Sequence, residues 1–426
     1  MSHPATPPPL IRTRPRLLTG GYSGRPGTLA EHLARHGTRP SCGGESQRED
    51  IIREVERAGL AGRGGAAFPT ATKLRALAAA RLSPVVIGNG VEGEPASDKD
   101  KVLLAVAPHL VLDGAAAAAE LTGAGRVVIV AHHAVTDIVG RAVAERRSVD
   151  WDPVPVQVMA AADRFTAGEA SAVVHWVERG VPTPTGRPAR LGGPGRSRRP
   201  ALVQNVETLA HLALIIRHGA SWFTAAGTPA EPGTMLVTLL GAVRRPGVYE
   251  IEIGTPAGGL IELAGGAAAP LGALLIGGYF GTWAEPAAAL PRPFSSAGLA
   301  PIGASPGAGV LAALPAAACG LSETARITRY LAGSSAGQCG PCVFGLDAIA
   351  GQLERLAAGR GADLDRLSRW LGHVTGRGAC RHPDGTAAMV ASALRVFGAE
   401  TRLHARGWCS ATGTAGVLPV PGQARS

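Results

Sequence analysis

Short β-branched segments on either side of an alanine-rich segment constrain the fold more than any other feature of this sequence. SPVVIGNG (83–90) and GRVVIVAHH (125–133) are apolar runs that stop at Gly, Asn or His, and a helix is expected between them near 108–122. Strand, helix and strand in this order are typical of an α/β domain with a mostly parallel sheet. Ligands of such sheets lie in the loops that follow the strands, so functional residues are expected there.

The pattern changes after residue 228. GTMLVTLLGAVRRPGVYEIEIGTP (233–256) contains two alternating apolar runs around a turn-rich Arg-Arg-Pro-Gly, and a short helix is expected at 257–266. This order predicts a β-hairpin and helix of a small α+β module. From residue 321 apolar residues recur at helical spacing in several segments joined by short loops, which predicts a helical bundle.

These changes divide the chain into five regions. They are an N-terminal extension (1–40) with a short helix at 28–37, an α/β domain (41–228), the α+β module (229–320), the helical domain (321–405) and a C-terminal tail (406–426).

The formal net charge of +10 raises the question of a nucleic-acid partner. The densest basic run, RPARLGGPGRSRRP (187–200), has no aromatic residue to stack on bases, so we expect a solvated loop and no nucleic-acid binding. MSHPATPPPL at the N-terminus lacks the apolar core of a secretory signal. Three prolines interrupt the uncharged stretch at 301–321, and they would break a membrane helix. We therefore expect a cytoplasmic protein without a transmembrane helix, at most peripheral to a membrane complex.

A glycine-rich stretch, GLAGRGGAAFPTATKL (59–74), combines bare backbone with two cations and one aromatic ring. Backbone N–H groups without side chains can bind a phosphate or approach a flat ring, and Arg63 and Lys73 would add positive charge. The stretch matches neither the dinucleotide fingerprint nor the P-loop. A plain glycine-rich connection is therefore the alternative.

An acidic loop, GNGVEGEPASDKDK (88–101), follows directly after the first predicted strand. Asn89, Glu92 and Glu94 in this loop can hydrogen-bond the hydroxyls of a ribityl or ribose chain. The alternative is a solvated acidic turn.

Five segments together resemble a known family. In chain order they are GLAGRGGAAFPTATKL, NGVEGEPASDKD, FTAGEASA, LVQNVETLAHLALIIRHGASWF and SSAGQCGPC. Over roughly residues 50–400 the chain resembles the flavin-binding, NADH-oxidising subunit of respiratory complex I and its relatives in hydrogenases and formate dehydrogenases. The resemblance implies an α/β FMN-binding domain with a mostly parallel sheet, a β-grasp domain of the soluble-ligand-binding (SLBB) type at 229–320, and a C-terminal helical iron–sulfur domain.

The resemblance also implies a set of residues around FMN and NADH. These residues are Gly62, Arg63, Gly64, Phe68, Lys73, Asn89, Glu92, Glu94, Gly168, Glu169, Asn205 and Thr208. Gly62, Arg63, Gly64 and Lys73 would surround the flavin phosphate, and Phe68 would stack on the adenine of the nucleotide.

The other members of this set would complete the pocket. Asn89 and Glu92 would bind the flavin, and Glu94 would face the nucleotide. Gly168 and Glu169 would line the same pocket. Asn205 and Thr208 would close it around the ribityl phosphate.

Two departures from the family pattern concern this site. Val91 stands where the family has a carboxylate that holds the flavin chain, and Gly168-Glu169-Ala170-Ser171 replaces Gly-Glu-Glu-Thr. The second aromatic residue that the family has just after the lysine is also missing. These changes affect NADH binding more than FMN binding.

The iron–sulfur site also departs from the family. Clusters are held by thiolates, commonly four, and the resemblance implies Cys339, Cys342 and Cys380 as ligands, with Ala336 in the place of the first cysteine. Three thiolates fit a 4Fe–4S cluster with an outside fourth ligand such as water, Ser334 or Ser335. They also fit a 3Fe–4S cluster, or zinc with His382; an empty site is the remaining alternative. The remaining cysteines, Cys42, Cys319 and Cys409, are interpreted as ordinary small residues.

The sequence therefore predicts an FMN-dependent iron–sulfur oxidoreductase subunit. It would pass electrons between NADH and a ferredoxin or a partner subunit, and because the chemistry occurs on FMN, no catalytic side chain is expected. The alternative is a degenerate, non-enzymatic relative that keeps the scaffold, with or without flavin, as a docking or assembly module.

Overall fold

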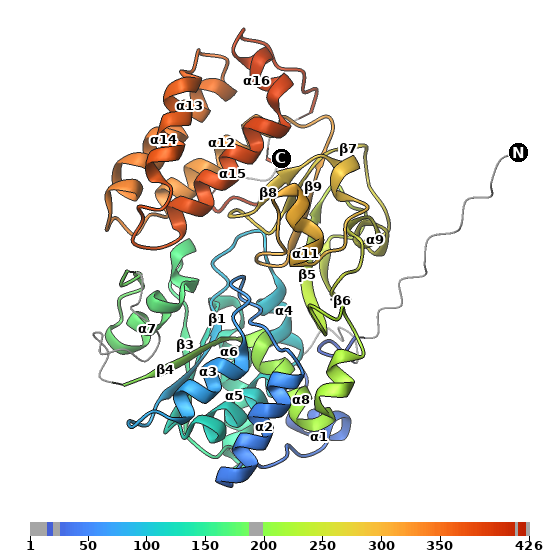
Figure 1. The fold of residues 1–426 in the computed structure, drawn as a ribbon, viewed down its shortest axis with the longest axis vertical. Coiled ribbons are helices and arrows are strands. Elements are labelled where there is room, and N and C mark those ends of the chain that lie inside the picture. The colour runs from blue at the N-terminus through green and yellow to red at the C-terminus, as the bar shows by residue number, and fades with distance from the viewer. Residues whose placement is uncertain (1–14, 20–25, 187–198, 414–415, 423–426) are drawn as a thin grey trace, which may run out of the picture.

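The computed structural model describes residues 15–19, 26–186, 199–413 and 416–422. The molecule has three parts (Figure 1): the α/β domain at the bottom, a β-rich module above it on the right, and the C-terminal helices on the left and at the top. Most of the predicted loop at 187–200, and residues 1–14 and 20–25 of the predicted N-terminal extension, lie outside the described residues.

The α/β domain is built on a parallel sheet in the order β3-β2-β1-β4. Its strands are β1 (Val85–Gly90), β2 (Arg126–Ala131), β3 (Val156–Ala160) and β4 (Ala201–Asn205). Its helices are α1 (Leu29–His36), α2 (Glu45–Arg57), α3 (Thr70–Ala78), α4 (Lys99–Val106), α5 (Pro108–Thr122), α6 (His133–Arg147), α7 (Ala170–Arg179) and α8 (Val206–Thr224). The predicted parallel α/β sheet is confirmed.

Both faces of this sheet are covered, as the continuous apolar strands require. On one face Val86 packs in the core formed with α2, α3, α5 and α8, and on the other face Val85 and Ile87 pack beneath α7. Helices α5 and α8 approach so closely that a Cβ atom at Gly114 would lie 1.8 Å from the carbonyl oxygen of Leu209. Glycine at position 114 is therefore required for this packing.

The middle module has a five-stranded sheet in the order β6-β5-β9-β7-β8. Its elements are β5 (Thr234–Gly241), β6 (Gly247–Glu252), α9 (Ala257–Leu263), β7 (Leu271–Ile276), β8 (Thr282–Ala284), α10 (Pro286–Ala289), α11 (Ser296–Leu299) and β9 (Val310–Pro315). The predicted hairpin is the antiparallel pair β5–β6, and the predicted helix is α9. The uncharged stretch at 301–321 contains β9, the central strand of this sheet, which explains its lack of charge.

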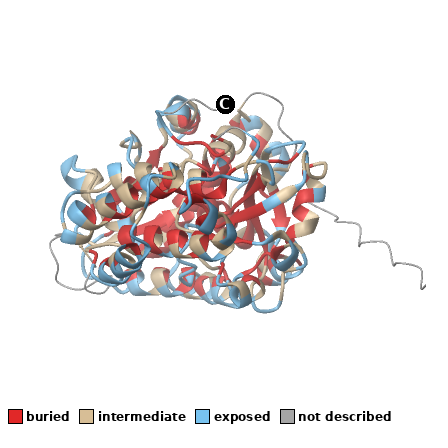
Figure 2. Cartoon of the chain, turned by 90° about the horizontal axis from the view of Figure 1, so that it is seen from above, coloured by how far each residue is buried: buried red, intermediate tan, exposed pale blue. Residues whose placement is uncertain are grey.

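The C-terminal part is the predicted helical bundle. It contains α12 (Gly320–Gly333), a π-helix (Pro341–Leu346), α13 (Asp347–Ala357), α14 (Leu364–Val374), α15 (His382–Val396) and α16 (Gly398–His404). The segment after α16 returns to the fold, because Leu418 and Val420 are buried in the core beneath α12. Each part has its own buried apolar core, and Figure 2 shows the buried residues inside a shell of exposed ones.

Within the described ranges, each helix taken singly is too short or too polar to cross a membrane. Helices α4 and α5 meet the length and hydropathy criterion only as a pair, across a bend of 96°.

A buried ion cluster on α5 fastens the N-terminal segment to the α/β domain. The Asp113 carboxylate is fully buried and contacts the ring of His32 (2.8 Å) and the guanidinium groups of Arg146 (2.9 Å) and Arg217. Burial alone would raise the pKa of Asp113, but the hydrogen bond with His32 and the charges of Arg146 and Arg217 hold it well below its usual value. Asp113 is therefore ionised, and it neutralises cations that have little access to water.

Asp113→Ala should lower the free energy of unfolding by about 3–5 kcal/mol, because it removes the carboxylate partner of the buried Arg217 and one of the two carboxylate partners of the buried Arg146, which keeps Asp152. Because the pKa of Asp113 is depressed by folding, its contribution is present at neutral pH and is lost as the pH falls below about 4. Urea unfolding of both proteins at pH 7 and at acid pH measures this difference. Asp365→Ala, at an exposed aspartate, is the control, and a loss no larger than that of the control would contradict the prediction.

Candidate functional site

The glycine-rich stretch forms a closed loop at the edge of the parallel sheet. Ala61 and Pro69 form an isolated β-bridge, and the N–H of Gly62 donates to the carbonyl oxygen of Phe68 at 2.9 Å. Gly65 has a φ of +92°, a backbone conformation that favours glycine. The loop therefore presents an exposed, bare backbone between two fixed ends.

The predicted ligands from distant segments meet beside this loop. Asn89 lies near the end of β1, and its side-chain amide donates to the carbonyl oxygen of Gly168 at 2.9 Å. Asn205 ends β4 and caps α8, and its amide donates to the carbonyl oxygen of Asn89 at 3.2 Å. The Thr208 hydroxyl accepts the backbone N–H of Arg63 at 2.9 Å. The structure thus brings these residues together at the carboxyl edge of the sheet, where α/β proteins bind ligands.

Lys73 on α3 is a partly buried cation without a counterion. Its Nζ atom donates to the carbonyl oxygen of Val203 at 3.2 Å and lies 5.7 Å from the centre of the Phe68 ring. Burial lowers the pKa of Lys73. Among the residues that the structure describes, no carboxylate lies within ion-pair distance of it. An ammonium group removed from water in this way is stabilised by an anion.

Lys99, by contrast, is a buried cation whose partners are complete. Its Nζ lies 2.6 Å from a carboxylate oxygen of Asp100, 2.9 Å from one of Glu207 and 3.3 Å from the side-chain oxygen of Asn205. Burial alone would lower the pKa of Lys99, but the charges of Asp100, Glu207 and Glu92 raise it above its usual value. This network fixes Asn205 and the first turn of α8.

Arg63 divides its contacts between the loop and the middle module. Its backbone lies in the glycine loop, whereas its guanidinium donates to the carbonyl oxygen of Pro232 at 3.3 Å. The Nε atom of Arg63 has no hydrogen-bond partner among the described residues. The contact of its guanidinium with a flavin phosphate therefore stays a prediction.

The two glutamates of the acidic loop are held by the chain itself. The Glu92 carboxylate accepts the Ser97 hydroxyl at 2.7 Å and the backbone N–H groups of Asp100 and Lys101 at 2.9 Å each. The Glu94 carboxylate accepts the backbone N–H of Tyr279 at 2.7 Å, which joins the loop to the turn between β7 and β8.

Both glutamates have a raised pKa. Burial, together with the charge of Asp100, raises the pKa of Glu92 to about 7, and burial raises that of Glu94 to about 7. Glu169, the third carboxylate of the predicted set, caps α7 by accepting the N–H groups of Ser171 (2.9 Å) and Ala172 (3.1 Å). Ligand contacts of all three carboxylates stay predictions.

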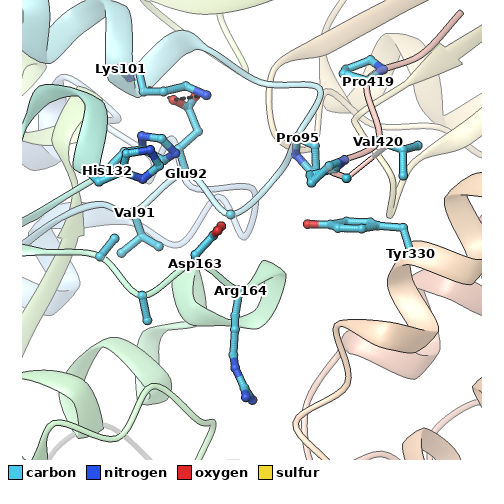
Figure 3. Close-up of a pocket in the computed structure, with 16 residues that line it drawn as sticks. Val91, Glu92, Pro95, Lys101, His132, Asp163, Arg164, Tyr330, Pro419 and Val420 are labelled. Atoms are coloured by element: carbon cyan, nitrogen blue, oxygen red, sulfur yellow. Dashed lines mark hydrogen bonds and ion pairs between the residues drawn. The ribbon is translucent and has the colours of Figure 1, made fainter. Parts of the chain in front are cut away.

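A cavity of about 340 Å³ lies beside the acidic loop (Figure 3). Its lining includes Val91 and Glu92 from the loop, Asp163 and Arg164 from the segment before α7, and Tyr330 from α12. In Figure 3, Tyr330 and the C-terminal residues beside it face the loop from the helical domain. Sequence reasoning did not find this cavity, because its lining comes from several distant segments that carry no common motif.

The three predicted cluster cysteines lie close together in the helical domain. Cys342 lies in the π-helix, and its N–H donates to the carbonyl oxygen of Cys339 at 3.1 Å. Burial raises the pKa of Cys342 to about 12, and the neighbouring Cys339 and Cys380 raise it too, whereas a hydrogen bond with the Ser335 side chain lowers it. Cys339, Cys380 and the Ser335 hydroxyl are therefore neighbours of the Cys342 thiol.

The sulfur atoms of the three cysteines are not gathered around a single point. In the described part of the chain, the sulfur atoms of Cys339, Cys342 and Cys380 do not all lie within 4.8 Å of one another. A cubane distributes its ligands over several iron atoms, whereas one zinc ion gathers them around a single centre. His382, the other zinc ligand considered, has its Nε2 atom 2.7 Å from the carbonyl oxygen of Leu331.

A second group of potential metal ligands was not predicted. Cys319 and Cys409, interpreted from the sequence as ordinary small residues, lie together with Glu400 and His404. The pattern Glu-x-x-x-His-x-x-x-x-Cys at 400–409 was the available sequence indication.

Three family models match the chain in the order of its parts. The Nuo51 FMN-binding domain matches residues 55–214, the SLBB domain matches 236–274, and the NADH-ubiquinone oxidoreductase-F iron-sulfur binding region matches 322–404.

Individual proteins match over most of the chain. The F 2 subunit of the NADH-quinone oxidoreductase of Rhizobium meliloti (strain 1021) is 30% identical over 379 residues, which cover 85% of this chain and 90% of that protein. The α subunit of the NAD-reducing hydrogenase HoxS of Cupriavidus necator is 32% identical over 234 residues, covering 51% of this chain and 38% of that protein.

Solved structures of an NAD⁺-reducing [NiFe]-hydrogenase share the fold. The structure in the H₂-reduced state has a TM-score of 0.75 at 30% identity, and the match covers 84% of this chain and 62% of that hydrogenase chain. The structure in the air-oxidized state has a TM-score of 0.78 at 28% identity and covers 93% of this chain and 69% of that one. From these matches and from the order of its three domains, the chain belongs to the family of the F-type subunits of NADH-quinone oxidoreductases.

Proposed function

We propose that this chain is an electron-transfer subunit that binds FMN, oxidises NADH and passes the electrons through an iron–sulfur cluster to a partner. The observation that carries the proposal is the unpaired ammonium of Lys73 beside the glycine loop. A docking module without flavin has no need for a partly buried cation that lacks a counterion. The chain would act on the cytoplasmic side, as a peripheral part of a larger assembly.

The residues at the sheet edge fit the phosphate end of FMN. Lys73 offers a positive charge, and the bare backbone of Gly64 and Gly65 allows close approach. The α8 helix begins directly after Asn205, and a helix N-terminus favours an anion. FMN supplies the redox chemistry when bound, because it takes up electrons in pairs and releases them singly.

The nucleotide would lie over the exposed side of the same loop. The Phe68 side chain is 42% exposed and lies beside Lys73, so it is available to stack on a flat base. Ala170 replaces an acidic residue of the family pattern, and the second aromatic residue after the lysine is missing, which leaves Phe68 and the loop backbone with a larger share of nucleotide binding. The residues of this chain bind and orient the nucleotide and exclude water.

The cluster site fits a cubane with three thiolate ligands. Cys339, Cys342 and Cys380 would hold three iron atoms, and the hydroxyl of Ser335, already beside Cys342, is placed to approach the fourth. Val343 and Phe344, which follow Cys342, are 46% and 75% exposed. This apolar surface next to the cluster ligands would receive the electron-accepting ferredoxin or partner subunit.

Lys73→Met should weaken FMN binding about 10- to 100-fold, because one charge-assisted hydrogen bond to the phosphate is lost. Fluorescence quenching during FMN titration of the flavin-free protein measures the change. Arg81→Met removes an exposed cation elsewhere in the same domain and should leave the affinity unchanged. Equal FMN affinities of the Lys73→Met variant and the wild type would refute the phosphate role.

Phe68→Ala should slow the anaerobic bleaching of bound flavin by NADH at limiting NADH, while FMN stays bound. The loss of an aromatic contact corresponds to roughly a 10-fold change in apparent NADH affinity. Phe344→Ala removes an equally bulky exposed ring near the cluster and serves as the control. If NADH leaves the wild-type flavin oxidised, the chain does not oxidise NADH.

Ala336→Cys should raise the iron content towards four iron atoms per chain and prolong the survival of the cluster in air, because it supplies the missing thiolate. Iron and sulfide analysis after anaerobic reconstitution provides the measurement. Ala79→Cys, which adds a thiol at an exposed position of the α/β domain, should have no such effect. If neither the wild type nor Ala336→Cys retains iron, the three cysteines do not form a cluster site.

A further inference from the structure

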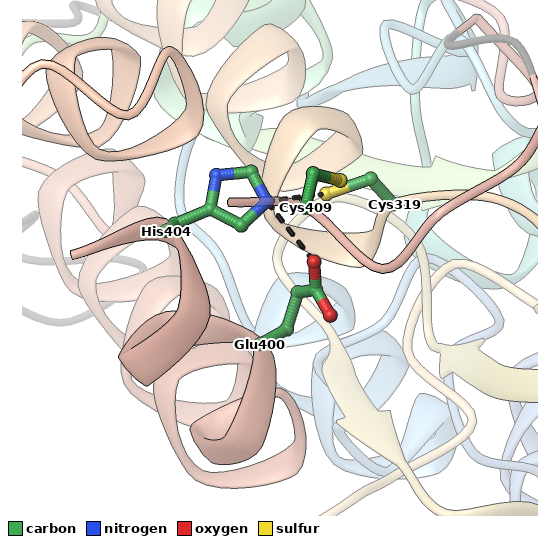
Figure 4. Close-up of side chains that lie close together, drawn as sticks. All are labelled: Cys319, Glu400, His404 and Cys409. Carbon is green, nitrogen blue, oxygen red and sulfur yellow. Dashed lines mark hydrogen bonds and ion pairs between the residues drawn. The ribbon is translucent and has the colours of Figure 1, made fainter. Parts of the chain in front are cut away.

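Four side chains at the far end of the helical domain form a compact group apart from the flavin and cluster residues. Cys319 precedes α12, Glu400 and His404 lie one turn apart on α16, and Cys409 follows in the C-terminal segment (Figure 4). One ligand atom from each lies within 4.8 Å of those of the other three. Residues separated by about ninety positions in the sequence thus converge on one point.

Two separations within this group are close to those of tetrahedral coordination. The sulfur atom of Cys319 lies 3.4 Å from Nε2 of His404, and that nitrogen lies 3.1 Å from an oxygen of Glu400. Ligands of tetrahedral zinc lie roughly 3.5 Å apart for sulfur and nitrogen and roughly 3.4 Å apart for nitrogen and oxygen, given the usual bond lengths. These two pairs differ from the tetrahedral values by no more than a few tenths of an ångström, and the ligand atom of Cys409 lies within 4.8 Å of the other three.

The hydrogen bonds around the group hold the ligand atoms in place. The Nδ1 atom of His404 lies 3.1 Å from the carbonyl oxygen of Leu356, which requires a proton on Nδ1 and directs Nε2 at the group. The backbone N–H of Ser410 donates to Glu400 at 2.8 Å, and that of Ser322 donates to the sulfur of Cys319 at 3.4 Å. Histidine ligands of metals usually have such an oriented second nitrogen.

The position of Nε2 calls for a proton or a metal ion. With its proton on Nδ1, the His404 ring directs a lone pair towards a carboxylate oxygen and a sulfur atom, both of which are electron-rich. Either a second proton on the ring, a thiol proton or a metal ion must lie between them. Two sulfurs, one imidazole and one carboxylate form a full set of four ligands for a metal ion.

We propose that Cys319, Glu400, His404 and Cys409 bind one Zn²⁺ ion in a structural site. Sulfur and imidazole ligands in a tetrahedral arrangement favour zinc among the common divalent ions, and a complete set of four protein ligands is typical of structural sites. Zinc binding displaces the two thiol protons into solvent. Cys319 and His404 are buried, whereas Cys409 is exposed and provides the path of entry.

The ion would fasten the C-terminal segment to the start of α12. The α12 helix begins directly after the proposed zinc ligand Cys319 and ends before the loop that carries Ser335 and Cys339. The zinc site would therefore stabilise the helix that supports the cluster site, without taking part in electron transfer. The inference does not depend on the proposed function, because no flavin or cluster residue belongs to the group.

The test uses the full chain with Cys339→Ser and Cys342→Ser, so that the cluster site does not bind metal. Co²⁺ is titrated under anaerobic, reducing conditions, and the visible bands of tetrahedral cobalt and the thiolate-to-cobalt absorption are followed. We expect about one Co²⁺ per chain, displaced by Zn²⁺. Cys409→Ser should reduce binding to well below half an ion per chain, and because Cys409 is exposed this variant should fold. Cys42→Ala, which removes a buried thiol outside the group, should bind like the parent.

The same experiment has three results that would overturn the proposal. One is the absence of tetrahedral cobalt bands in the parent protein. Another is equal binding in the parent and the Cys409→Ser variant, confirmed by a second variant, His404→Ala. The third is a Cys319–Cys409 disulfide in the protein purified anaerobically, found by alkylation and mass spectrometry. A zinc-loaded parent should also melt at a higher temperature than the chelator-treated protein, and the Cys409→Ser variant should lose this difference.

Discussion

The buried ion pair network of Lys99 is the interaction on which the arrangement of the flavin site depends. Lys99 lies near the end of the acidic loop, at the first residue of α4, and its partners Asp100 and Glu207 belong to α4 and α8. Glu207 also accepts the backbone N–H of Leu236 in β5, so the network extends to the middle module. Removing one member of such a network leaves a buried charge, which costs several kcal/mol. The loop after β1 and the N-terminus of α8 are therefore held in one arrangement before any ligand binds.

Lys99 and Lys73 differ in whether a carboxylate of the protein neutralises the ammonium group, and this difference assigns a structural role to Lys99 and a ligand-binding role to Lys73. Lys99 is satisfied by the protein, whereas Lys73 has a carbonyl oxygen as its hydrogen-bond partner and no counterion in the described residues. The cost of partly burying the Lys73 ammonium is recovered when an anion binds. The proposed zinc ligands are likewise oriented before the ion binds, because backbone hydrogen bonds hold His404 and Glu400 towards a shared position.

Much of the fold and part of the site could be predicted from local sequence. The runs at 83–90 and 125–133 gave β1 and β2, because strands buried on both faces need continuous apolar residues, and the hairpin at 233–256 followed from its turn residues. Side-chain directions could not be predicted: Glu94 contacts the backbone of Tyr279, and the Arg63 guanidinium reaches Pro232. The proximity of Cys319 to Cys409 could not be predicted either, because it depends on the docking of α16 against α13 and α15, which the local pattern at 400–409 does not reveal.

The account predicts that the phosphate makes a large contribution to flavin affinity. FMN and riboflavin differ only in this group, so the ratio of their dissociation constants for the flavin-free chain isolates its contribution. Fluorescence quenching at one ionic strength gives both constants. FMN should bind at least about 10- to 100-fold more tightly, as expected for a charge-assisted contact to Lys73 with support from the loop backbone. Equal affinities for FMN and riboflavin would contradict the assignment of Lys73 and the glycine loop as a phosphate site.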